Sequence, residues 1–390
     1  MHIITLVYTT GSYQTARLQA ACIACQKKGW NFTVIQVTSS SQEHPWGERI
    51  EESLFSLHTL SSSRKLTNNL RSSGEFSKIR ELLYLLQKLS PTVLILPGWG
   101  KALYQVALFW ARRHRVPAIL LSESKWDDQR RTRLKEGLKF HFLIEKYSAA
   151  IVGGQLHREY ITKLGFPRKR VFMGYDVVDN RYFAERALKV RENPQAAITC
   201  ETSIPTRPYL LIVTRLIERK NVLGFLKAYA TYIQRCETER PYDLVICGHG
   251  EEEPLIKQFI LQAELQGRVH LPGFVTYQSL GDWYGLASAL VHPAIQEQWG
   301  LVINEACAAG LPVLCSSTIG ARYELVREGK NGFLFDPTRV DEMTHVLLKF
   351  HQLDDDTRTK MGQLGQEIVA EYPPEKFAAA LVQAVETALS

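Results

Sequence analysis

The chain has 390 residues, which is long for one domain and suits two domains of about 190 residues each. Its composition, 45% hydrophobic and 22% charged, excludes a disordered or fibrous protein, and the sequence has no run of about 18 uncharged apolar residues that would predict a membrane-spanning helix. The net charge of +7 is unevenly divided: residues 1–191 contain 30 Lys and Arg against 15 Asp and Glu, whereas residues 192–390 contain 17 against 25.

The first half of the chain alternates short apolar runs with longer amphipathic stretches. This alternation predicts buried parallel strands joined by helices. The predicted strands are 3–8, 32–37, 93–96, 118–121 and 149–152, and the helices between them include 14–28, 76–89 and 104–114. The polar, Ser-rich segment 39–73 is expected to be a surface excursion.

The same alternation restarts in the second half. Its predicted strands are 209–213, 243–247, 269–271, 289–292 and 311–315, with helices that include 222–235 and 254–264. Two such sets predict an α/β protein made of two doubly wound, Rossmann-like domains. Ligands of such sheets bind beyond the carboxyl ends of the strands, and two facing domains would place a site in the cleft between them.

Composition sets the domain boundaries. We expect a first domain over 1–191 and a second over 209–372, joined by a linker over 192–208 that contains three prolines and shows no helical or strand period. A last amphipathic helix is predicted over 373–390, with a return onto the first domain as one option.

The N-terminus and the cysteines indicate a cytoplasmic, reduced protein. The opening sequence MHIITLVYTTG leads directly into a strand pattern and lacks the features of a signal peptide. The seven cysteines are odd in number and scattered, so they do not predict a disulfide framework, and Cys22 and Cys25 are expected to be packing residues.

The segment 292–314 is the most informative about chemistry. Its pattern is strand, loop, helix, glycine and strand, with Glu297 in the loop and the helix starting near Trp299 or Gly300. Because glycine has no side chain, a ligand could approach the first free N–H groups of this helix, a setting that favours phosphate. Glu305 lies further along the helix, where a carboxylate suits the hydroxyl groups of a sugar. Two ordinary surface acids are the alternative interpretation.

Two further loops follow strands of the second domain. Arg215 lies just beyond one strand and Lys220 at the start of the next helix, so the two cations could clamp a diphosphate and neutralise its charge as it leaves. Solvated surface cations are the alternative. Gly248 and Gly250 form a G-x-G turn, which is weak evidence for a phosphate loop. His249 between them is expected to be a turn histidine without a partner, with contact to a ligand as the alternative.

Together these clusters resemble the retaining nucleotide-sugar glycosyltransferases of the GT-B fold, in particular glycosyltransferase family 4. The resemblance covers about residues 209–337. It comprises, in order, the R-x4-K loop from Arg215 to Lys220, the G-x-G turn, LPGFV at 271–275, the E-x7-E element from Glu297 to Glu305 and NGFLFDP at 331–337. A set in this order and spacing is specific.

The resemblance implies roles for individual residues. Arg215, Lys220 and Glu297 would be the catalytic residues, the two cations holding the donor diphosphate and Glu297 contacting the transferred sugar. Glu305 would bind the nucleotide ribose, the backbone at 300–302 the phosphate or sugar, and that at 274–275 the base. The donor-binding set as a whole is Gly11, Gly248, Phe274, Val275, Trp299, Gly300, Leu301, Val302 and Glu305.

The first domain resembles the family less closely. Many members have a Gly-Gly pair after the first strand, where this chain has only Gly11, and many have a histidine after the strand that corresponds to 118–121, where this chain has none. Candidates on the acceptor side are therefore Ser12, Tyr13, Glu123 and Asp127, with ordinary polar surface as the alternative.

No metal ion or other cofactor is expected. Asp354, Asp355 and Asp356 match an Asp-x-Asp metal signature, but they follow a helix rather than a strand, and GT-B enzymes do not usually depend on a metal. We expect a solvated acidic cap there. The basic runs 112–115 and 130–133 have little aromatic interleaving, so no nucleic-acid partner is expected.

The expected activity is retaining transfer of a sugar from a UDP- or GDP-sugar to a hydroxyl of a lipid, glycan or secondary metabolite. The alternatives are a nucleotide-sugar 2-epimerase of the same fold and a non-catalytic sugar- or nucleotide-binding partner subunit. Because the basic half would receive the acceptor, we expect an anionic or membrane-borne acceptor and peripheral attachment at the inner face of the membrane. A soluble acceptor is the alternative, and the oligomeric state is not predicted.

Overall fold

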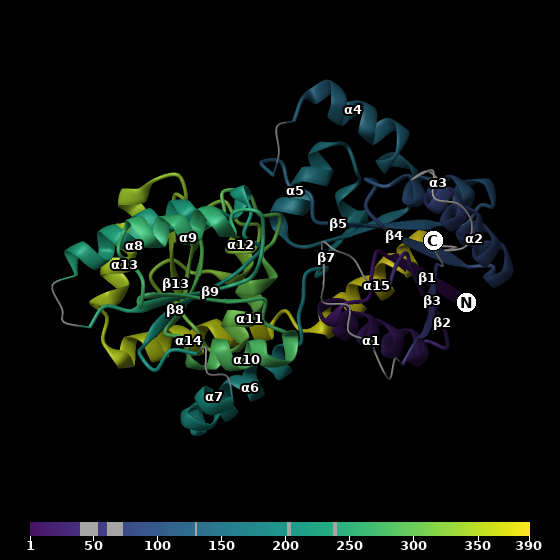
Figure 1. Cartoon of the computed structure of the whole chain (residues 1–390). Coiled ribbons are helices and arrows are strands. Elements are labelled where there is room, and N and C mark those ends of the chain that lie inside the picture. The colour runs from purple at the N-terminus through teal and green to yellow at the C-terminus, as the bar shows by residue number, and fades with distance from the viewer. Residues whose placement is uncertain (40–53, 61–72, 129–130, 201–203, 237–239) are drawn as a thin grey trace. The chain divides into compact units, whose positions relative to one another are not determined.

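The structure is a computed structural model that describes residues 1–39, 54–60, 73–128, 131–200, 204–236 and 240–390 (Figure 1). The chain forms two compact units. The first comprises Met1–Trp126, Arg130–Val178 and Pro374–Ser390, and the second Asp179–Pro373 with Asp127–Gln129. Each unit has a parallel sheet whose central strands are buried along their whole length, because helices cover both faces.

The sheet of the first unit has, among the described residues, seven strands in the order β3-β2-β1-β4-β5-β6-β7. Their bounds are β1 His2–Val7, β2 Asn31–Gln36, β3 Ser56–Thr59, β4 Val93–Pro97, β5 Ala118–Ser122, β6 Ala149–Val152 and β7 Val171–Met173. All pairs are parallel, with Ile3 opposite both Phe32 and Val93. The strand order reverses between β1 and β4, so their carboxyl ends mark a ligand-binding edge.

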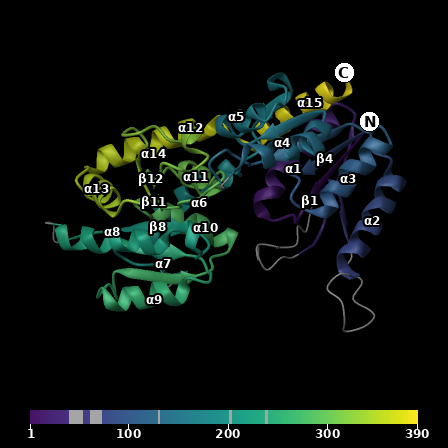
Figure 2. The ribbon, with the colours of Figure 1, turned by 90° about the horizontal axis from the view of Figure 1, so that it is seen from above.

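The helices of the first unit are α1 Ser12–Lys27, α2 Ser73–Leu89, α3 Ala102–Arg113, α4 Arg133–Phe142, α5 Gln155–Lys163 and α15 Pro374–Leu389. The C-terminal helix α15 lies against α1 and against β6 and β7 (Figure 1, Figure 2). Arg17 of α1 donates to the carbonyl and hydroxyl oxygens of Tyr175 at 3.0 and 3.1 Å, and the Tyr175 ring packs on Phe377 of α15. The last helix is thus part of the first unit.

The sheet of the second unit has, in the part of the chain that is described, six strands in the order β10-β9-β8-β11-β12-β13. Their bounds are β8 Tyr209–Val213, β9 Asp243–Cys247, β10 Val269–Gly273, β11 Ala289–His292, β12 Val313–Ser316 and β13 Gly332–Phe335. Here the order reverses between β8 and β11. The segments that follow these two strands carry Arg215, Lys220 and Glu297.

Helices of the second unit pack in two layers. One layer has α8 Val222–Arg235, α9 Glu253–Gln262 and α13 Val340–His351, whose apolar side chains, such as Phe225 and Phe350, build a buried core on the sheet. The other has α6 Asn180–Glu192, α10 Tyr277–Leu286, α11 Leu301–Ala308 and α14 Asp355–Ala370, and the short α7 Pro194–Cys200 follows α6 (Figure 1).

The predicted linker over 192–208 differs from the structure. The chain passes between the units at Val178–Asp179, and α6 belongs to the second unit. It packs on α10, where Tyr182 stacks on Tyr277 at 5.0 Å between ring centroids. The segment 192–208 contains α7, because Pro194 occupies the first position of that helix, where the missing N–H costs nothing. A proline taken as a breaker therefore starts a helix.

The predicted surface excursion over 39–73 also needs correction. Residues 56–59 form β3, which adds to the sheet in parallel with β2 and pairs Val34 with Leu57. The strands β7 and β13 were likewise not predicted, being three and four residues long. Residues 40–53 and 61–72 lie outside the described part of the chain.

Candidate active site

Two of the predicted catalytic residues meet beyond the carboxyl ends of β8 and β11. Lys220 closes the short 3-10 helix η3, Glu218–Lys220, which follows β8, and Glu297 lies in the loop after β11. Nζ of Lys220 donates a hydrogen bond to Oε2 of Glu297 in an ion pair. Lys220 is buried and Glu297 is half-buried, so this ion pair is largely shielded from solvent at the edge of the sheet.

Backbone contacts hold the two loops together. The carbonyl oxygen of Arg219 accepts from the N–H of Ile295 at 2.9 Å. The side-chain amide of Asn221 donates to the carbonyl oxygens of Pro293 at 3.3 Å and Pro337 at 2.7 Å. Asn221 has φ +57°, a left-handed conformation that asparagine tolerates better than most residues. These bonds fix the Lys220–Glu297 pair from both sides.

His292, the last residue of β11, completes this arrangement and was not predicted. Its Nε2 lies 3.1 Å from Oε2 of Glu297, and its ring is buried. Burial lowers the pKa of His292 below its usual value, so the ring is neutral and Nε2 carries the proton donated to the carboxylate. Nδ1 has no hydrogen-bond partner in the described structure. A histidine at the end of an otherwise apolar buried strand was the available signal.

The Glu297 carboxyl is held ionised. Burial by itself would raise its pKa, but Lys220 and His292 outweigh burial and hold the pKa well below its usual range. Burial lowers the pKa of Lys220 from its usual value, against the attraction of Glu297. The site therefore presents an anionic carboxylate between a cation and a neutral donor.

The helix α11 begins beside this pair. Gly300 is its N-cap at φ +99°, a conformation that favours glycine, and no side chain caps the helix. A Cβ at Gly300 would lie 3.4 Å from Cγ of Glu297 and 3.6 Å from Nε2 of His292. The N-terminal N–H groups at Leu301 and Val302, both half-buried, are thus placed next to the Glu297 site, as an anionic group of a ligand requires.

Two residues of the predicted donor set lie inside the protein instead. The indole of Trp299 is buried and donates from Nε1 to Oδ1 of Asn304 at 2.8 Å, so it is a core residue. Glu305 has no exposed surface and accepts from the hydroxyl of Tyr284 at 2.6 Å. Glu305 thus contacts α10 through Tyr284, and its predicted contact with a ribose stays a prediction.

Arg215 and Gly248 meet at the ends of β8 and β9. Arg215 is half-buried, makes no side-chain hydrogen bond or ion pair with any described residue, and is near enough to help lower the pKa of Lys220. Gly248 has φ +142°, and a Cβ there would lie 1.8 Å from the carbonyl oxygen of Thr214. The glycine lets the two loops touch, which positions Arg215.

His249 was predicted to have no partner, and this is wrong. Its Nδ1 lies 3.0 Å from Oε2 of Glu253, and its Nε2 accepts from the N–H of Phe274 at 3.1 Å. The G-x-G turn is thus tied to the segment that holds Phe274 and Val275, both half-buried. This bond occupies the Phe274 N–H that was expected to meet a base.

The remaining candidates come from the first half of the chain. Gly11 is the buried N-cap of α1, and its carbonyl oxygen accepts from the N–H of Gln14 at 2.9 Å. Ser12 and Tyr13 open α1, but their side chains lie outside the described part of the structure. Glu123 and Asp127 follow β5, and Glu123 is half-buried whereas Asp127 is exposed. Their acceptor-side roles stay predictions.

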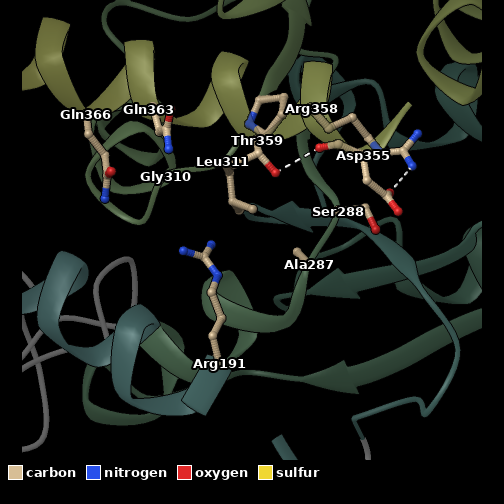
Figure 3. A pocket seen from close by; sticks show the side chains of 11 residues that line it. Arg191, Ala287, Ser288, Gly310, Leu311, Asp355, Arg358, Thr359, Gln363 and Gln366 are labelled. Atoms are coloured by element: carbon tan, nitrogen blue, oxygen red, sulfur yellow. Dashed lines mark hydrogen bonds and ion pairs between the residues drawn. The ribbon is translucent and has the colours of Figure 1, made fainter. Parts of the chain in front are cut away.

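A pocket of about 460 Å³ in the second unit lies elsewhere (Figure 3). Ser288 and Pro312, which precede β11 and β12, line it, so it opens at the amino ends of strands whose carboxyl ends bear the candidate site. Its Arg191 donates to the carbonyl oxygens of Gly285 at 2.9 Å and Ala309 at 2.7 Å, at the ends of α10 and α11. Arg191 thus binds carbonyl groups at the ends of two helices. None of the predicted site residues lines this pocket.

Comparison with known families agrees with the geometry. Residues 199–368 match the family model described as glycosyl transferases group 1, a region that contains the whole Lys220–Glu297–His292 cluster. This region of the chain is therefore similar to the glycosyl transferases group 1 family. The family model does not cover the first unit.

Two curated relatives are similar to part of this chain. The chain is 32% identical over 147 residues to O-antigen chain mannosyltransferase B of Escherichia coli, a match that covers 37% of each chain. It is 28% identical over 172 residues to alpha-D-kanosaminyltransferase of Streptomyces kanamyceticus, covering 44% of this chain and 42% of that one. The matches thus span less than half the length of either relative.

Solved structures resemble the whole chain. A glycosyltransferase from Rickettsia africae ESF-5 has a TM-score of 0.75 at 12% identity, covering 100% of this chain and 98% of that one. Anabaena Alr3699/HepE in complex with UDP and glucose has a TM-score of 0.72 at 16% identity, covering 98% and 99%. At such identities the likeness shows the fold, and the predicted GT-B architecture of two Rossmann-like units is confirmed.

Proposed function

We propose that this chain is a retaining glycosyltransferase of family 4 that moves a sugar from a UDP- or GDP-sugar to an acceptor hydroxyl. The observation that carries the proposal is the meeting of Lys220, Glu297 and His292 beside the open N-terminus of α11. The family match and the relatives named mannosyltransferase and kanosaminyltransferase support it. The complex of HepE with UDP and glucose supports a nucleoside diphosphate donor.

The chemistry that this site offers is stabilisation of a leaving group. A donor diphosphate would lie among Arg215, Lys220 and the first N–H groups of α11, which together neutralise the charge that develops as the sugar–oxygen bond breaks. Glu297 would accept hydrogen bonds from the transferred sugar, and the acceptor hydroxyl would attack on the face that the diphosphate leaves. These groups need no metal ion to hold the diphosphate.

The acceptor would be bound by the first unit. That unit carries 27 Lys and Arg against 13 Asp and Glu, whereas the second carries 20 against 27. An anionic or membrane-borne acceptor, with the protein attached peripherally to the inner face of the membrane, suits this division. Among the described residues, no helix is both long and apolar enough to cross a bilayer.

The test is nucleotide release from a panel of UDP-, GDP- and ADP-sugars, with and without acceptors. We expect release from one nucleotide class, stimulated by an acceptor and greatly reduced in Arg215→Ala. Binding of a nucleotide sugar without release would indicate a non-catalytic partner subunit. Conversion of the nucleotide sugar into its 2-epimer, with no glycoside formed, would favour the 2-epimerase.

A further inference from the structure

The helix α4 turns its apolar side to solvent. Leu134, Leu138 and Phe142 follow one another at intervals of four residues, so they form a stripe on one face of the helix. Their exposed fractions are 74%, 51% and 60%. In an ordinary surface helix such a stripe faces the core. Here the only residue of α4 that is buried is Glu136, on the opposite side.

A polar network holds α4 in this orientation. The carboxylate of Glu136 accepts from Nη1 of Arg131 at 3.1 Å, from Nζ of Lys139 at 2.7 Å and from the hydroxyl of Tyr160 at 2.5 Å. Burial alone would raise the pKa of Glu136, but Lys139, Tyr160 and Arg131 together lower it, so the carboxyl stays ionised. Rotating the stripe inward would break this network, and the apolar face therefore stays outside.

The same network corrects the charge argument made from sequence. Arg131 and Lys139 contribute to the positive excess of the first unit, but both neutralise Glu136. Arg112 and Arg113 lie at the C-terminal end of α3, which runs from the carboxyl edge of the sheet to its amino edge. The cations of the first unit thus do not form one patch.

What remains beside the stripe is a smaller basic set. Arg133 and Lys135 of α4 are exposed, and neither forms an ion pair with any described residue. Lys135 borders Phe142 on the helix surface, since seven residues are nearly two turns. A stripe of large apolar side chains with unpaired cations next to it is the pattern of a helix that lies in the interface of an anionic bilayer.

Charge also decides between occupants of this face. A second copy of the chain would bring the first unit, with its excess of 14 positive charges (27 against 13), against itself. Like charges across an interface oppose association, whereas lipid phosphates attract these cations. A lipid surface would therefore both cover the apolar stripe and attract the cations beside it.

The position of α4 connects this face to the ligand-binding edge of the first sheet. Nζ of Lys139 lies 5.3 Å from the ring centroid of Trp99, two residues beyond β4. At the same edge a pocket of about 480 Å³ is lined by residues that include Tyr8, Lys78 and Lys101. Lys139 of α4 thus lies at the edge of the sheet at which this pocket opens.

We propose that α4 is a membrane-docking element, whose stripe Leu134, Leu138 and Phe142 enters the interface of an anionic bilayer while Arg133 and Lys135 bind lipid phosphates. The proposal deepens the proposed function and rests on it for the identity of the acceptor, which would be a lipid presented at the carboxyl edge of the first sheet. Docking itself is measured without any transfer reaction.

The experiment is flotation of the full chain with vesicles of phosphatidylcholine and with vesicles that also contain phosphatidylglycerol, at low and high salt. We expect binding to the second kind only, weakened by salt because screening shields the phosphates. Leu134→Ser with Leu138→Ser should lower the partition coefficient by about tenfold or more. Arg133→Gln and Lys135→Gln should each lower it by about fivefold.

The matched control is Leu255→Ser with Leu261→Ser on α9, two leucines that are 54% and 60% exposed on the acidic second unit. This variant should bind vesicles like the wild type. Absence of wild-type binding at low salt, or equal losses in the stripe and control variants, would overturn the proposal. So would a dimer in solution that the stripe variant dissociates, because a second copy would then cover the stripe.

Nucleotide release, measured both with vesicles and without them, separates this proposal from the proposed function. A chain that releases nucleotide but does not float with anionic vesicles refutes docking and leaves the transferase standing. A chain that floats through its stripe but releases no nucleotide from any donor supports docking and refutes the transferase.

Discussion

His292 and Lys220 converge on a single oxygen of Glu297: Nε2 of the histidine lies 3.1 Å from Oε2, which also accepts from the lysine ammonium. Both partners use Oε2, and no described residue bonds to Oε1. The carboxylate is therefore ionised, fixed in direction and left with one oxygen for a ligand. Such an oxygen can accept a hydrogen bond from a sugar hydroxyl, which is compatible with the proposed contact of Glu297 with the transferred sugar.

Removing either cation should disable the leaving-group site. We expect Arg215→Ala to lower kcat by about two to three orders of magnitude, the loss typical of one transition-state charge stabiliser. Lys220→Ala should lower it at least as much, because it also leaves Glu297 half-buried without its cation. Steady-state kinetics with a responsive donor measures both. Lys227→Ala, an exposed lysine on α8, is the control and should keep full activity.

Thermal unfolding of each variant shows whether lost activity reflects lost structure. A folded Arg215→Ala protein with wild-type kcat would remove Arg215 from the site and leave Lys220 alone to meet the diphosphate.

The stability of the protein should depend on pH through His292. Its pKa in the folded protein is lowered by burial, so the unfolded chain binds a proton below about pH 6.5 that the folded chain does not. The stabilisation is complete above that pH and is lost as the pH falls toward the folded pKa. We expect this residue to account for up to about 1 kcal/mol of the free energy of unfolding lost between about pH 6.5 and about pH 5.5.

Urea unfolding of the wild type and of His292→Gln at several pH values measures this contribution. The glutamine can still donate to Glu297 but does not titrate, so its stability curve should be flatter over this interval. Glu297 has the same sign but acts at lower pH, since its own pKa is depressed. Parallel curves for the two proteins would show that His292 is protonated or accessible in the folded state.

A methyl group at Gly248 should displace the loop that carries Arg215. The added Cβ would lie 1.8 Å from the carbonyl oxygen of Thr214, a backbone atom that cannot move without moving Arg215. We expect Gly248→Ala to lose about 1–3 kcal/mol of stability from this overlap and to lose most of its activity. Gly267→Ala is the matched control, because Gly267 also has a positive φ, +82°, but meets no atom within 4 Å.

Activity and stability of the two glycine variants are compared by kinetics and by urea unfolding. Equal activity in the two proteins would mean that backbone strain alone, and not the position of Arg215, sets the effect at Gly248.

The sequence predicted most strands and helices well, but it predicted the directions of the side chains less well. Strands such as β5 and β9 are continuous apolar runs, and such runs are recognisable without a structure. The E-x7-E spacing located Glu297 and Glu305 but not their directions. Glu297 precedes the helix that starts at Leu301, so helical periodicity does not relate the two residues. The hydrogen bond from Tyr284 of α10 to Glu305 is visible only in the structure.

The misplaced boundary and the missed contacts have a similar cause. Proline is favoured at the first position of a helix and disfavoured inside one, and the sequence alone did not show which case applies to Pro194. The bonds from His249 to Phe274 and from His292 to Glu297 join loops that follow different elements. Partners of this kind are set by the order of strands in the sheet, which periodicity does not reveal.

Transfer should not require a divalent metal ion. The proposed diphosphate site already offers Arg215, Lys220 and the N-terminus of α11, which together match the charge that a metal ion would neutralise. The Asp-x-Asp sequence does not compete for this role. Asp354 caps α14 by accepting from the N–H of Thr357 at 2.6 Å, and Asp356 pairs with Lys360 at 2.6 Å. The expectation of an acidic cap there is confirmed.

We therefore expect nucleotide release to continue in EDTA at the rate found without it, and Asp356→Asn to keep wild-type activity. The measurement is the initial rate with a responsive donor, before and after chelation and after adding back Mg²⁺ or Mn²⁺. A complete loss in EDTA that either ion restores would contradict the prediction. It would then follow that Arg215, Lys220 and the helix end are insufficient by themselves, since the chelator touches none of them, and Asp356→Asn would show whether α14 supplies the missing ligand.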